Sequence, residues 1–283
     1  MEENTLTSGI AEVLGMDVYS HVQKEKEKNL LPLVIREIER AVSNSEEIRR
    51  FFEKQKIRTE QIQSLADVPA MPVQMFKYFD LKTCPKENVV KVMRSSGTTA
   101  NVQSKVPLDK TTMMNQIKAL QAILASYLGN KRRIFLVIDH EKINDPVLEF
   151  TARTAGVRGL SIYAKKTFYL LKEETDGSLV LNLPVIQEIR NEYADSEVYI
   201  FGFTYIIWTV FYQQMKAAGL DLKLKNPTLF HSGGWKKLKS QSVSKEYFNE
   251  QISEMFGCSK DLILDFYGMA EQTGIIFPDC PCG

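Results

Sequence analysis

Apolar residues in the first eighty positions recur at the three- and four-residue spacing of amphipathic helices, with charged residues between them. The clearest stripe is made of Leu30, Leu33, Val34, Ile38, Ala41 and Val42. Pro69 and Pro72 then interrupt the pattern, because proline cannot continue a helix. We therefore expect residues 1–87 to form a helical N-terminal segment packed on a core.

From residue 88 to 283 the pattern changes to short apolar runs that alternate with helical stretches. Strands are predicted at 88–93, 105–108, 133–138, 197–203, 227–232 and 261–267, with two more around the turn at Asp176 and Gly177. Helices are predicted at 109–128, 184–194, 204–219 and 244–257; Asp109 can cap the first and Gly129 can end it. This alternation favours an α/β sheet covered by helices on both faces.

Composition narrows the class of protein. The 36 lysine and arginine residues nearly balance the 35 aspartate and glutamate residues, for a formal charge of +1, so no strong field favours nucleic acid or acidic lipid. The chain has no apolar run of membrane-spanning length, and its start lacks the order of a signal peptide. We expect a cytoplasmic protein without a membrane span, whose four cysteines form no disulfide framework.

The first stretch with candidate chemistry follows the strand at 88–93. Small hydrogen-bonding residues gather there: Ser95, Ser96, Gly97, Thr98 and Thr99. Their amides and hydroxyls can surround an anion, and Lys105 can add a positive charge. The spacing does not match a Walker loop. A phosphate-binding hairpin and a plain polar turn are both open from the residues alone.

The second stretch follows the strand at 227–232. Gly233 and Gly234 allow a flat ligand to approach the backbone, and Trp235 offers an aromatic surface. His231 can transfer a proton. The alternative is a Gly-Gly turn beside a core tryptophan and a structural histidine.

The third stretch lies at 265–274. Tyr267 and Gly268 end a strand and can cover a nucleobase, and Glu271 can hold Mg²⁺ near a phosphate. The alternative is an ordinary strand end followed by a helix.

In this order, "SSGTT", "GGW" and "YGMAE" resemble the phosphate loop, the adenine-side glycine pair and the Tyr-Gly-x-x-Glu signature of the adenylate-forming superfamily. The segments "MPVQMFKYFDL" and "HSGGWKK" resemble most closely the acyl-protein synthetase family of bacterial bioluminescence. The resemblance runs from about residue 68 to the end. It implies the large N-terminal domain of the adenylate-forming fold.

The resemblance also implies roles for individual residues. The loop at 95–99 would wrap the β- and γ-phosphates of ATP, and Thr98 or Thr99 with Glu271 would hold Mg²⁺; Thr98, Lys105 and Glu271 are the catalytic candidates. Tyr267 and Gly268 would lie along the adenine. Opposite them would lie Gly233, Gly234 and Trp235. The acyl pocket would be lined by Phe201, Gly202, Phe203 and Trp208, for which a buried core helix is the alternative.

The implied activity is ATP-dependent conversion of a carboxylic acid, expected to be fatty, into an acyl-adenylate, with transfer of the acyl group to a protein cysteine and then to a reductase partner. Two alternatives stay open: an acyl-CoA ligase of the phenylacetate-CoA ligase type, and a non-catalytic module that binds a nucleotide or an acid.

Two departures from the superfamily pattern bear on these expectations. Ala100 stands where a glycine usually follows the second threonine. The sequence ends twelve residues after Glu271, so the C-terminal lid and the late acceptor cysteine are expected to be absent. Cys280 and Cys282 are weak candidates for the acceptor thiol or for half of a zinc site.

Overall fold

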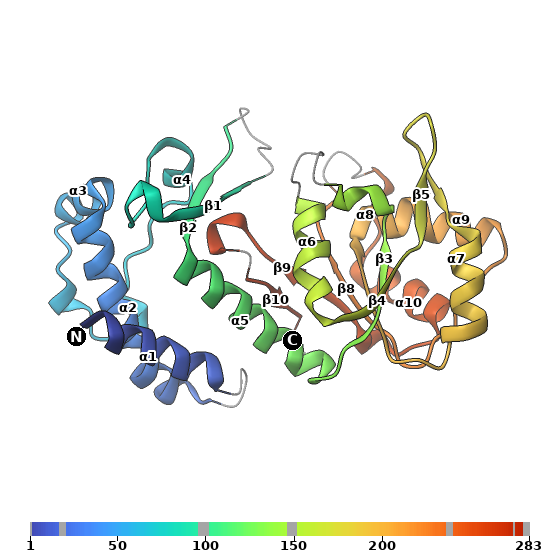
Figure 1. Ribbon diagram of the computed structural model, residues 1–283, viewed down its shortest axis with the longest axis horizontal. Coiled ribbons are helices and arrows are strands. Elements are labelled where there is room, and N and C mark those ends of the chain that lie inside the picture. Colours follow the sequence, from blue (N-terminus) through green and yellow to red (C-terminus); the bar gives the residue numbers. More distant parts are fainter. Residues whose placement is uncertain are drawn as a thin grey trace. The chain divides into compact units, whose positions relative to one another are not determined.

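The computed structural model describes residues 2–16, 21–95, 102–145, 152–235, 240–273 and 275–279 (Figure 1). The chain forms two compact units. Unit 1 comprises Met1–Ser126 and Gly268–Ile275, and unit 2 comprises Tyr127–Tyr267 and Ile276–Gly283. The predicted boundary between residues 87 and 88 falls inside unit 1, where the first strand begins, and it stays a prediction about domain organisation.

Unit 1 begins with helices, as the hydrophobic pattern predicts. They are α1 (Glu2–Gly15), α2 (Gln23–Asn44), α3 (Glu46–Gln55) and the single turn α4 (Met75–Tyr78). α2 packs against α1 and α3. Gly9 of α1 allows α2 to approach closely, since a Cβ atom at Gly9 would lie 2.7 Å from Leu33 Cδ2 of α2.

A hairpin follows in unit 1. Strands β1 (Val89–Arg94) and β2 (Lys105–Asp109) pair antiparallel, with Arg94 opposite Lys105. Their inward side chains Met93, Val106 and Leu108 are buried. The short helix η10 (Ala270–Gln272) contacts both strands, so a segment far along the sequence returns to this hairpin.

Helix α5 (Lys110–Leu128) carries the chain into unit 2. Both of its predicted ends are confirmed. The Thr112 amide donates to Asp109 Oδ1 over 2.7 Å, and Gly129 has φ of +69°, the left-handed conformation that ends a helix.

Unit 2 is built on a six-stranded sheet in the order β10-β9-β8-β7-β3-β4. The five strands from β9 to β4 are parallel, and β10 pairs antiparallel with β9. Their bounds are β3 Arg133–Ile138, β4 Ala164–Tyr169, β7 Val198–Phe203, β8 Thr228–Ser232, β9 Ile263–Tyr267 and β10 Phe277–Pro278. A separate hairpin, β5 (Leu171–Glu173) with β6 (Leu179–Leu181), closes around the predicted turn at Asp176 and Gly177.

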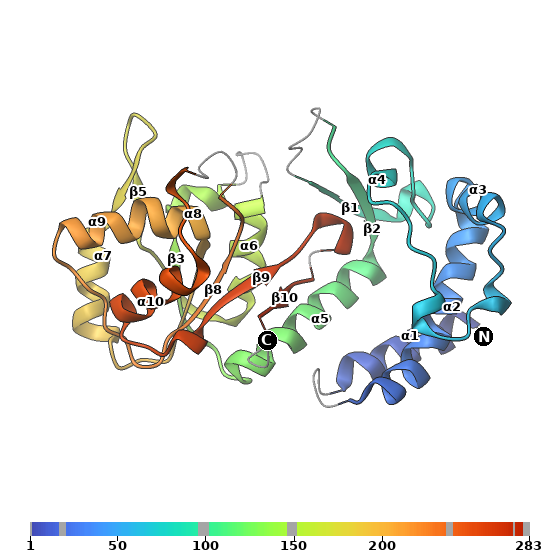
Figure 2. The ribbon, with the colours of Figure 1, turned by 180° about the vertical axis from the view of Figure 1, so that it is seen from behind.

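Side chains of the sheet alternate between two buried layers. Ile134, Leu136 and Ile138 of β3 belong to the largest apolar cluster, together with residues of the helices on that face. Those helical segments are α7 (Leu183–Glu188), α8 (Thr204–Ile206), α9 (Gln213–Ala217) and α10 (Lys245–Phe256), with the π-helical turns η6 (Ile189–Tyr193) and η7 (Ile207–Tyr212). Figure 2 shows α9 and α10 in front of the sheet. The predicted sheet with helices on both faces is confirmed.

The other face is covered by α6 (Ala152–Leu160), a helix that the hydrophobic pattern does not predict. Tyr199 of β7 stacks on Phe135 of β3 at 4.5 Å between ring centroids, and its hydroxyl donates to the Leu160 carbonyl of α6 over 2.8 Å. α6 approaches the sheet closely because Gly156 faces Phe201, where a Cβ atom would lie only 2.4 Å from the ring. Among the described residues, no helix is both long and apolar enough to cross a bilayer.

Candidate functional site

The hairpin of unit 1 presents the predicted phosphate loop. Of its five residues only Ser95 is described; Ser96, Gly97, Thr98 and Thr99 lie outside the described residues. Ser95 extends the pairing of β1 and β2 toward the loop, because its amide donates to the Ser104 carbonyl over 3.3 Å and its Oγ accepts from the Ser104 amide over 2.9 Å. Lys105, the next residue of β2, is exposed. The two strands therefore hold both ends of the loop in register.

Glu271 lies on η10, the turn that packs against β1 and β2. Its side chain is half-buried. The neighbouring Gln272 Oε1 is buried and has no hydrogen-bond partner among the described residues. The next residue, Thr273, has φ of +58°, a left-handed conformation that turns the chain sharply after the carboxylate. Unit 1 thus brings Glu271 to the hairpin that carries the predicted phosphate loop.

The glycine pair of unit 2 follows β8. Gly233 has φ of +91°, and a Cβ atom there would lie 2.7 Å from Phe203 Cδ1. Only glycine fits this position, both for its backbone and for its contact with β7. Gly234 is exposed, and Trp235 is half-buried against the main apolar cluster of unit 2. The glycine pair therefore lies at the carboxyl end of a parallel strand, where ligands of open α/β sheets bind.

His231 of β8 is buried under this turn, with 3% of its surface exposed. Its Nδ1 lies 2.9 Å from Thr204 Oγ1, its ring lies 4.8 Å from the Phe248 ring, and its Nε2 has no partner among the described residues. Burial lowers the pKa of His231 to about 4; Asp279 opposes this shift and Lys245 adds to it. The imidazole is therefore neutral at neutral pH, which fits a structural histidine better than a proton carrier.

Two carboxylates influence His231: Asp265 on the neighbouring strand β9, and Asp279 directly after β10. Asp265 Oδ1 of β9 is 3.8 Å from His231 Nδ1, and burial together with the charge of Asp279 raises the pKa of Asp265. Asp279 Oδ2 accepts from the Asp265 amide over 3.1 Å and pairs with Lys245 Nζ at 2.7 Å. Asp279, the residue after β10, thus links Asp265 of β9 with Lys245 of α10.

Tyr267 ends β9 with 56% of its surface exposed, and its ring centroid lies 6.4 Å from that of Phe277. Gly268, next in the chain, is also exposed. An exposed tyrosine at a strand end is free to cover a flat ligand. This geometry agrees with the predicted adenine contact, which stays a prediction.

Residues of the predicted acyl pocket lie mostly in the core of unit 2. Phe201 is 1% exposed, and Trp208 on η7 is 7% exposed and stacks on Tyr212 at 4.6 Å. A Cβ atom at Gly202 would lie 2.9 Å from Ile138 Cβ. Phe203 is the member that reaches the edge of the sheet, beside Gly233. The burial of Trp208 favours the buried-helix alternative for that residue, and the acyl pocket stays a prediction.

One charged cluster at the same edge of the sheet is absent from the sequence prediction. Asp139 directly follows β3 and is 3% exposed. Arg153 of α6 binds it through two hydrogen bonds: Nε donates to Asp139 Oδ2 over 2.8 Å, and Nη2 donates to Oδ1. Burial is the largest single influence and lowers the pKa of Arg153, but the hydrogen bonds and charge of Asp139, with smaller effects of Tyr205 and Glu173, together raise it. His140 is buried beside them, and its Nδ1 has no partner among the described residues. A polar pair directly after a buried parallel strand is the sequence feature that marks this position.

A metal centre is not evident in the described part of the chain, where no three His, Cys, Asp or Glu side chains gather closely enough to hold an ion. Cys280 and Cys282 lie outside the described residues. A zinc site or an acceptor thiol at these cysteines stays a prediction.

Comparison with solved structures supports the fold. The chain is similar to an open conformation of 2-hydroxyisobutyryl-CoA ligase in complex with 2-HIB-AMP and CoA, with a TM-score of 0.60 and 17% sequence identity over 88% of this chain and 51% of that chain. The predicted adenylate-forming fold is confirmed by this likeness.

Comparison with known sequences supports the family. The chain is 22% identical over 244 residues to the long-chain-fatty-acid–luciferin-component ligase of Vibrio harveyi. The match covers 83% of this chain and 61% of that protein, so the chain spans less than two thirds of its curated relative. The family model described as acyl-protein synthetase, LuxE, matches residues 2–283. The chain therefore belongs to the acyl-protein synthetase (LuxE) family.

Proposed function

We propose that this chain activates a carboxylic acid with ATP, forming an acyl-adenylate whose acyl group is then transferred to a protein cysteine. The observation that carries the proposal is the packing of η10, with Glu271, against the hairpin whose loop holds Ser95 to Thr99. These segments are more than 160 residues apart in sequence, and their packing brings the turn that carries Glu271 to the two strands that flank this stretch of amide and hydroxyl donors.

The residues present fit the groups that this chemistry needs. Mg²⁺ prefers carboxylate and other oxygen ligands, and Glu271 offers a half-buried carboxylate beside the unpartnered Gln272 Oε1. In unit 2 the exposed ring of Tyr267 and the open backbone at Gly234 suit a flat base. ATP supplies the phosphorus electrophile and the pyrophosphate leaving group.

In this proposal the protein contributes position and charge rather than a general base. The substrate carboxylate is already ionised near neutral pH, so no proton has to be removed before it attacks. The amides and hydroxyls of residues 95–99, with Lys105, would neutralise phosphate charge, and Thr98 or Thr99 with Glu271 would hold Mg²⁺. Gly233, Gly234 and Trp235 would flank the base in unit 2. Of the predicted acyl pocket, Phe203 is the residue best placed to meet the acyl group, since Phe201, Gly202 and Trp208 lie in the core.

The family description supports acyl transfer to a protein, and the name of the Vibrio harveyi relative supports a long-chain fatty acid as the substrate. The reductase partner rests on the family resemblance alone. Acyl transfer to coenzyme A is the second candidate, and the likeness to a CoA ligase is the observation that keeps it open. The two candidates differ in their acceptor: a protein cysteine supports the first, and dependence on coenzyme A supports the second.

ATP binding, measured by calorimetry with and without Mg²⁺, tests the proposal. We expect saturable binding that Mg²⁺ strengthens and that Glu271→Gln weakens about ten-fold or more, because a charged Mg²⁺ ligand is lost. Glu87→Gln is the matched control, since Glu87 is an exposed carboxylate in the same unit. Thr98→Val should weaken binding in the same direction. Equal binding by the Glu271 and Glu87 variants would contradict the role given to η10.

Activation itself is measured by acid-dependent exchange of pyrophosphate into ATP. A set of fatty and aryl acids should give exchange that Glu271→Gln removes and Glu87→Gln retains. ATP binding without exchange for any acid would instead favour the non-catalytic binding module.

A further inference from the structure

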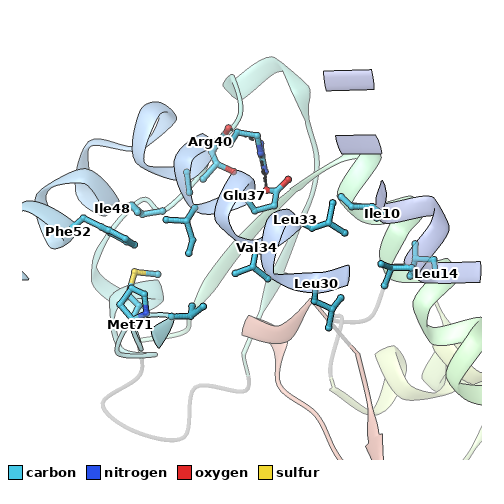
Figure 3. Close-up of a pocket in the computed structure, with 16 residues that line it drawn as sticks. Ile10, Leu14, Leu30, Leu33, Val34, Glu37, Arg40, Ile48, Phe52 and Met71 are labelled. Carbon is cyan, nitrogen blue, oxygen red and sulfur yellow. Dashed lines mark hydrogen bonds and ion pairs between the residues drawn. The ribbon is translucent and has the colours of Figure 1, made fainter. Parts of the chain in front are cut away.

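A cavity in the helical part of unit 1 is lined by no residue of the proposed activation site. Its volume is about 520 Å³, within the range of roughly 300–1,000 Å³ that is typical of ligand pockets. α1, α2 and α3 wall it, and the segment around Met71 closes another side (Figure 3). All of its lining residues belong to unit 1.

The lining is aliphatic. Thirteen of its sixteen residues are apolar, and Phe52 is the single aromatic among them. Figure 3 shows Leu30, Leu33 and Val34 of α2 along one wall, with Ile48 of α3 beyond them. Although α2 carries a long apolar stripe, none of its residues is fully buried. The C-terminal part of the stripe packs in part against the buried Ile48, Phe52 and Leu81, and the stripe from Leu30 to Ala41 also lines the cavity. Phe52 is the one ring of the lining on which a flat aromatic ligand could stack.

The polar part of the lining is small and already neutral. Arg40 Nε donates to Glu37 Oε2 over 2.9 Å, and Arg40 Nη1 donates to the Thr83 carbonyl over 3.3 Å. The Glu37–Arg40 pair carries no net charge, and Glu37 would repel a second carboxylate placed beside it. The chemistry at this end suits an uncharged polar group, such as a hydroxyl, carbonyl or ester.

The dimensions suit a chain of limited length. The wall runs along α2 from Leu30 to Ala41, about 16 Å at the helical rise. An extended alkyl chain advances about 1.25 Å per carbon, given C–C bonds of about 1.5 Å at near-tetrahedral angles. The wall thus matches about thirteen carbons. A second cavity of about 460 Å³ shares Val13, Leu14 and Leu30 with the first, so α1 has unfilled space on both sides.

We propose that the cavity between α1, α2 and α3 binds one linear alkyl chain of about a dozen carbons, with an uncharged polar end beside Glu37 and Arg40. This site goes beyond the proposed activation, because it needs neither ATP nor any residue of the 95–105 or 267–271 segments. Its ligand class is that of long-chain alcohols, aldehydes and acyl esters.

The two native tryptophans allow the site to be located. Trp208 and Trp235 both belong to unit 2, so a tryptophan introduced by Phe52→Trp is a reporter for unit 1 alone. The probe is 2-bromododecan-1-ol, added without ATP. Its bromine lies next to the hydroxyl, so it should reach the Glu37–Arg40 end of the cavity, where residue 52 packs near Ile38 and Ala41, and quench a tryptophan there. We expect it to quench the extra emission of the Phe52→Trp chain with saturation. No quenching of that extra emission overturns the proposal.

A variant that fills the cavity with a larger side chain tests whether the probe binds there. Val34→Phe in the Phe52→Trp chain should weaken quenching at least ten-fold, whereas Val73→Phe, an exposed position of the same unit that lines neither cavity, should leave it unchanged. Ile38→Phe, one turn along α2, replaces Val34→Phe if far-UV circular dichroism shows the latter to be unfolded. Equal quenching in the filled and control chains overturns the site.

Chain length and head group complete the test. Affinity should rise about four-fold per methylene from eight to twelve carbons and then level off as the cavity fills. A rise that continues to eighteen carbons points to nonspecific partition and overturns the proposal. The alcohol should bind at least as tightly as 2-bromododecanoate; a carboxylate that binds ten-fold tighter overturns the uncharged head group. Glu271→Gln should change none of these values, which separates this site from the proposed activation.

Discussion

Helix α2 of unit 1 and strand β3 of unit 2 are both rich in apolar residues, yet they bury them to different extents. Phe135, Leu136, Val137 and Ile138 of β3 each have 0% of their surface exposed. α2 is 22 residues long and has no buried residue at all. β3 lies between two strands and under helices on both faces, whereas the apolar stripe of α2 lines a cavity and packs only in part against α3. Hydrophobic periodicity therefore predicts which way a side chain points, but not whether its surroundings fill the space around it.

Leucine truncations should show the largest difference between the two regions. Leu136→Ala removes a fully buried side chain from a filled core, and we expect it to lower the free energy of unfolding of unit 2 by about 2–5 kcal/mol. Leu30→Ala removes a side chain that already lines both cavities, so the loss should be about 1 kcal/mol or less.

Each unit needs its own readout for this comparison. Tryptophan fluorescence during urea unfolding reports unit 2, because Trp208 and Trp235 both lie there. Hydrogen exchange of α2 peptides reports unit 1. Equal losses for Leu136→Ala and Leu30→Ala would mean that unit 1 is as tightly packed as unit 2.

Burial of a titratable group sharpens the comparison through pH. The folded-state pKa of His231, about 4, lies below its ordinary value of 6.5, so the unfolded chain binds the proton more tightly between these values. Stability should therefore be fully present above pH 6.5 and fall as the pH drops toward 4, by up to about 3 kcal/mol from this group. Asp265 has the opposite effect on stability: its pKa is raised in the folded state, so its contribution to the free energy of unfolding increases as the pH falls.

Comparing a His231 variant with the native chain isolates the contribution of His231 to the pH dependence of stability. His231→Gln should show a smaller loss of unfolding free energy between pH 7 and pH 4 than the native chain, measured by fluorescence. His21→Gln, at a half-exposed position in unit 1, should lose as much as the native chain. A loss in His231→Gln as large as that of the native chain would show that the buried imidazole does not govern the acid sensitivity of unit 2.

The elements that the sequence predicts correctly are those whose signals are local. α5 has its own cap, Asp109, and its own stop, Gly129, and β3 is a continuous apolar run. α6 has neither. Its nine residues include two glycines, and its packing depends on the close approach of Gly156 to Phe201, a residue 45 positions away. The sequence pattern therefore contains too little local information to predict this helix.

The candidate site shows the same limit. The turn at Gly233 can be predicted from its local motif, but its contact with Phe203 cannot, and the approach of a flat ligand to it stays a prediction. The ion pair of Asp139 with Arg153 joins residues fourteen positions apart on a strand end and a helix, a spacing that no simple periodicity links. The roles of Lys105, Glu271 and the loop at 95–99 stay predictions, since contacts with a ligand depend on chemistry that local patterns only suggest.

Helix caps should give the smallest effect and the least difference between the units. Asp109→Ala removes the acceptor for the Thr112 amide in unit 1, and Ser244→Ala removes the acceptor for the Tyr247 amide at the start of α10 in unit 2. Each cap bond satisfies one amide within its own helix turn, so each loss should be about 1 kcal/mol whatever the packing around it. Hydrogen exchange of the first turns of α5 and α10 measures both. If Asp109→Ala costs much less than Ser244→Ala, then the start of α5 is already frayed, and the looseness of unit 1 extends from its cavities to its helix ends. Equal losses for Asp109→Ala and Ser244→Ala would mean that the two units differ only in how tightly their side chains pack. The helix ends of unit 1 would then be as well ordered as those of unit 2.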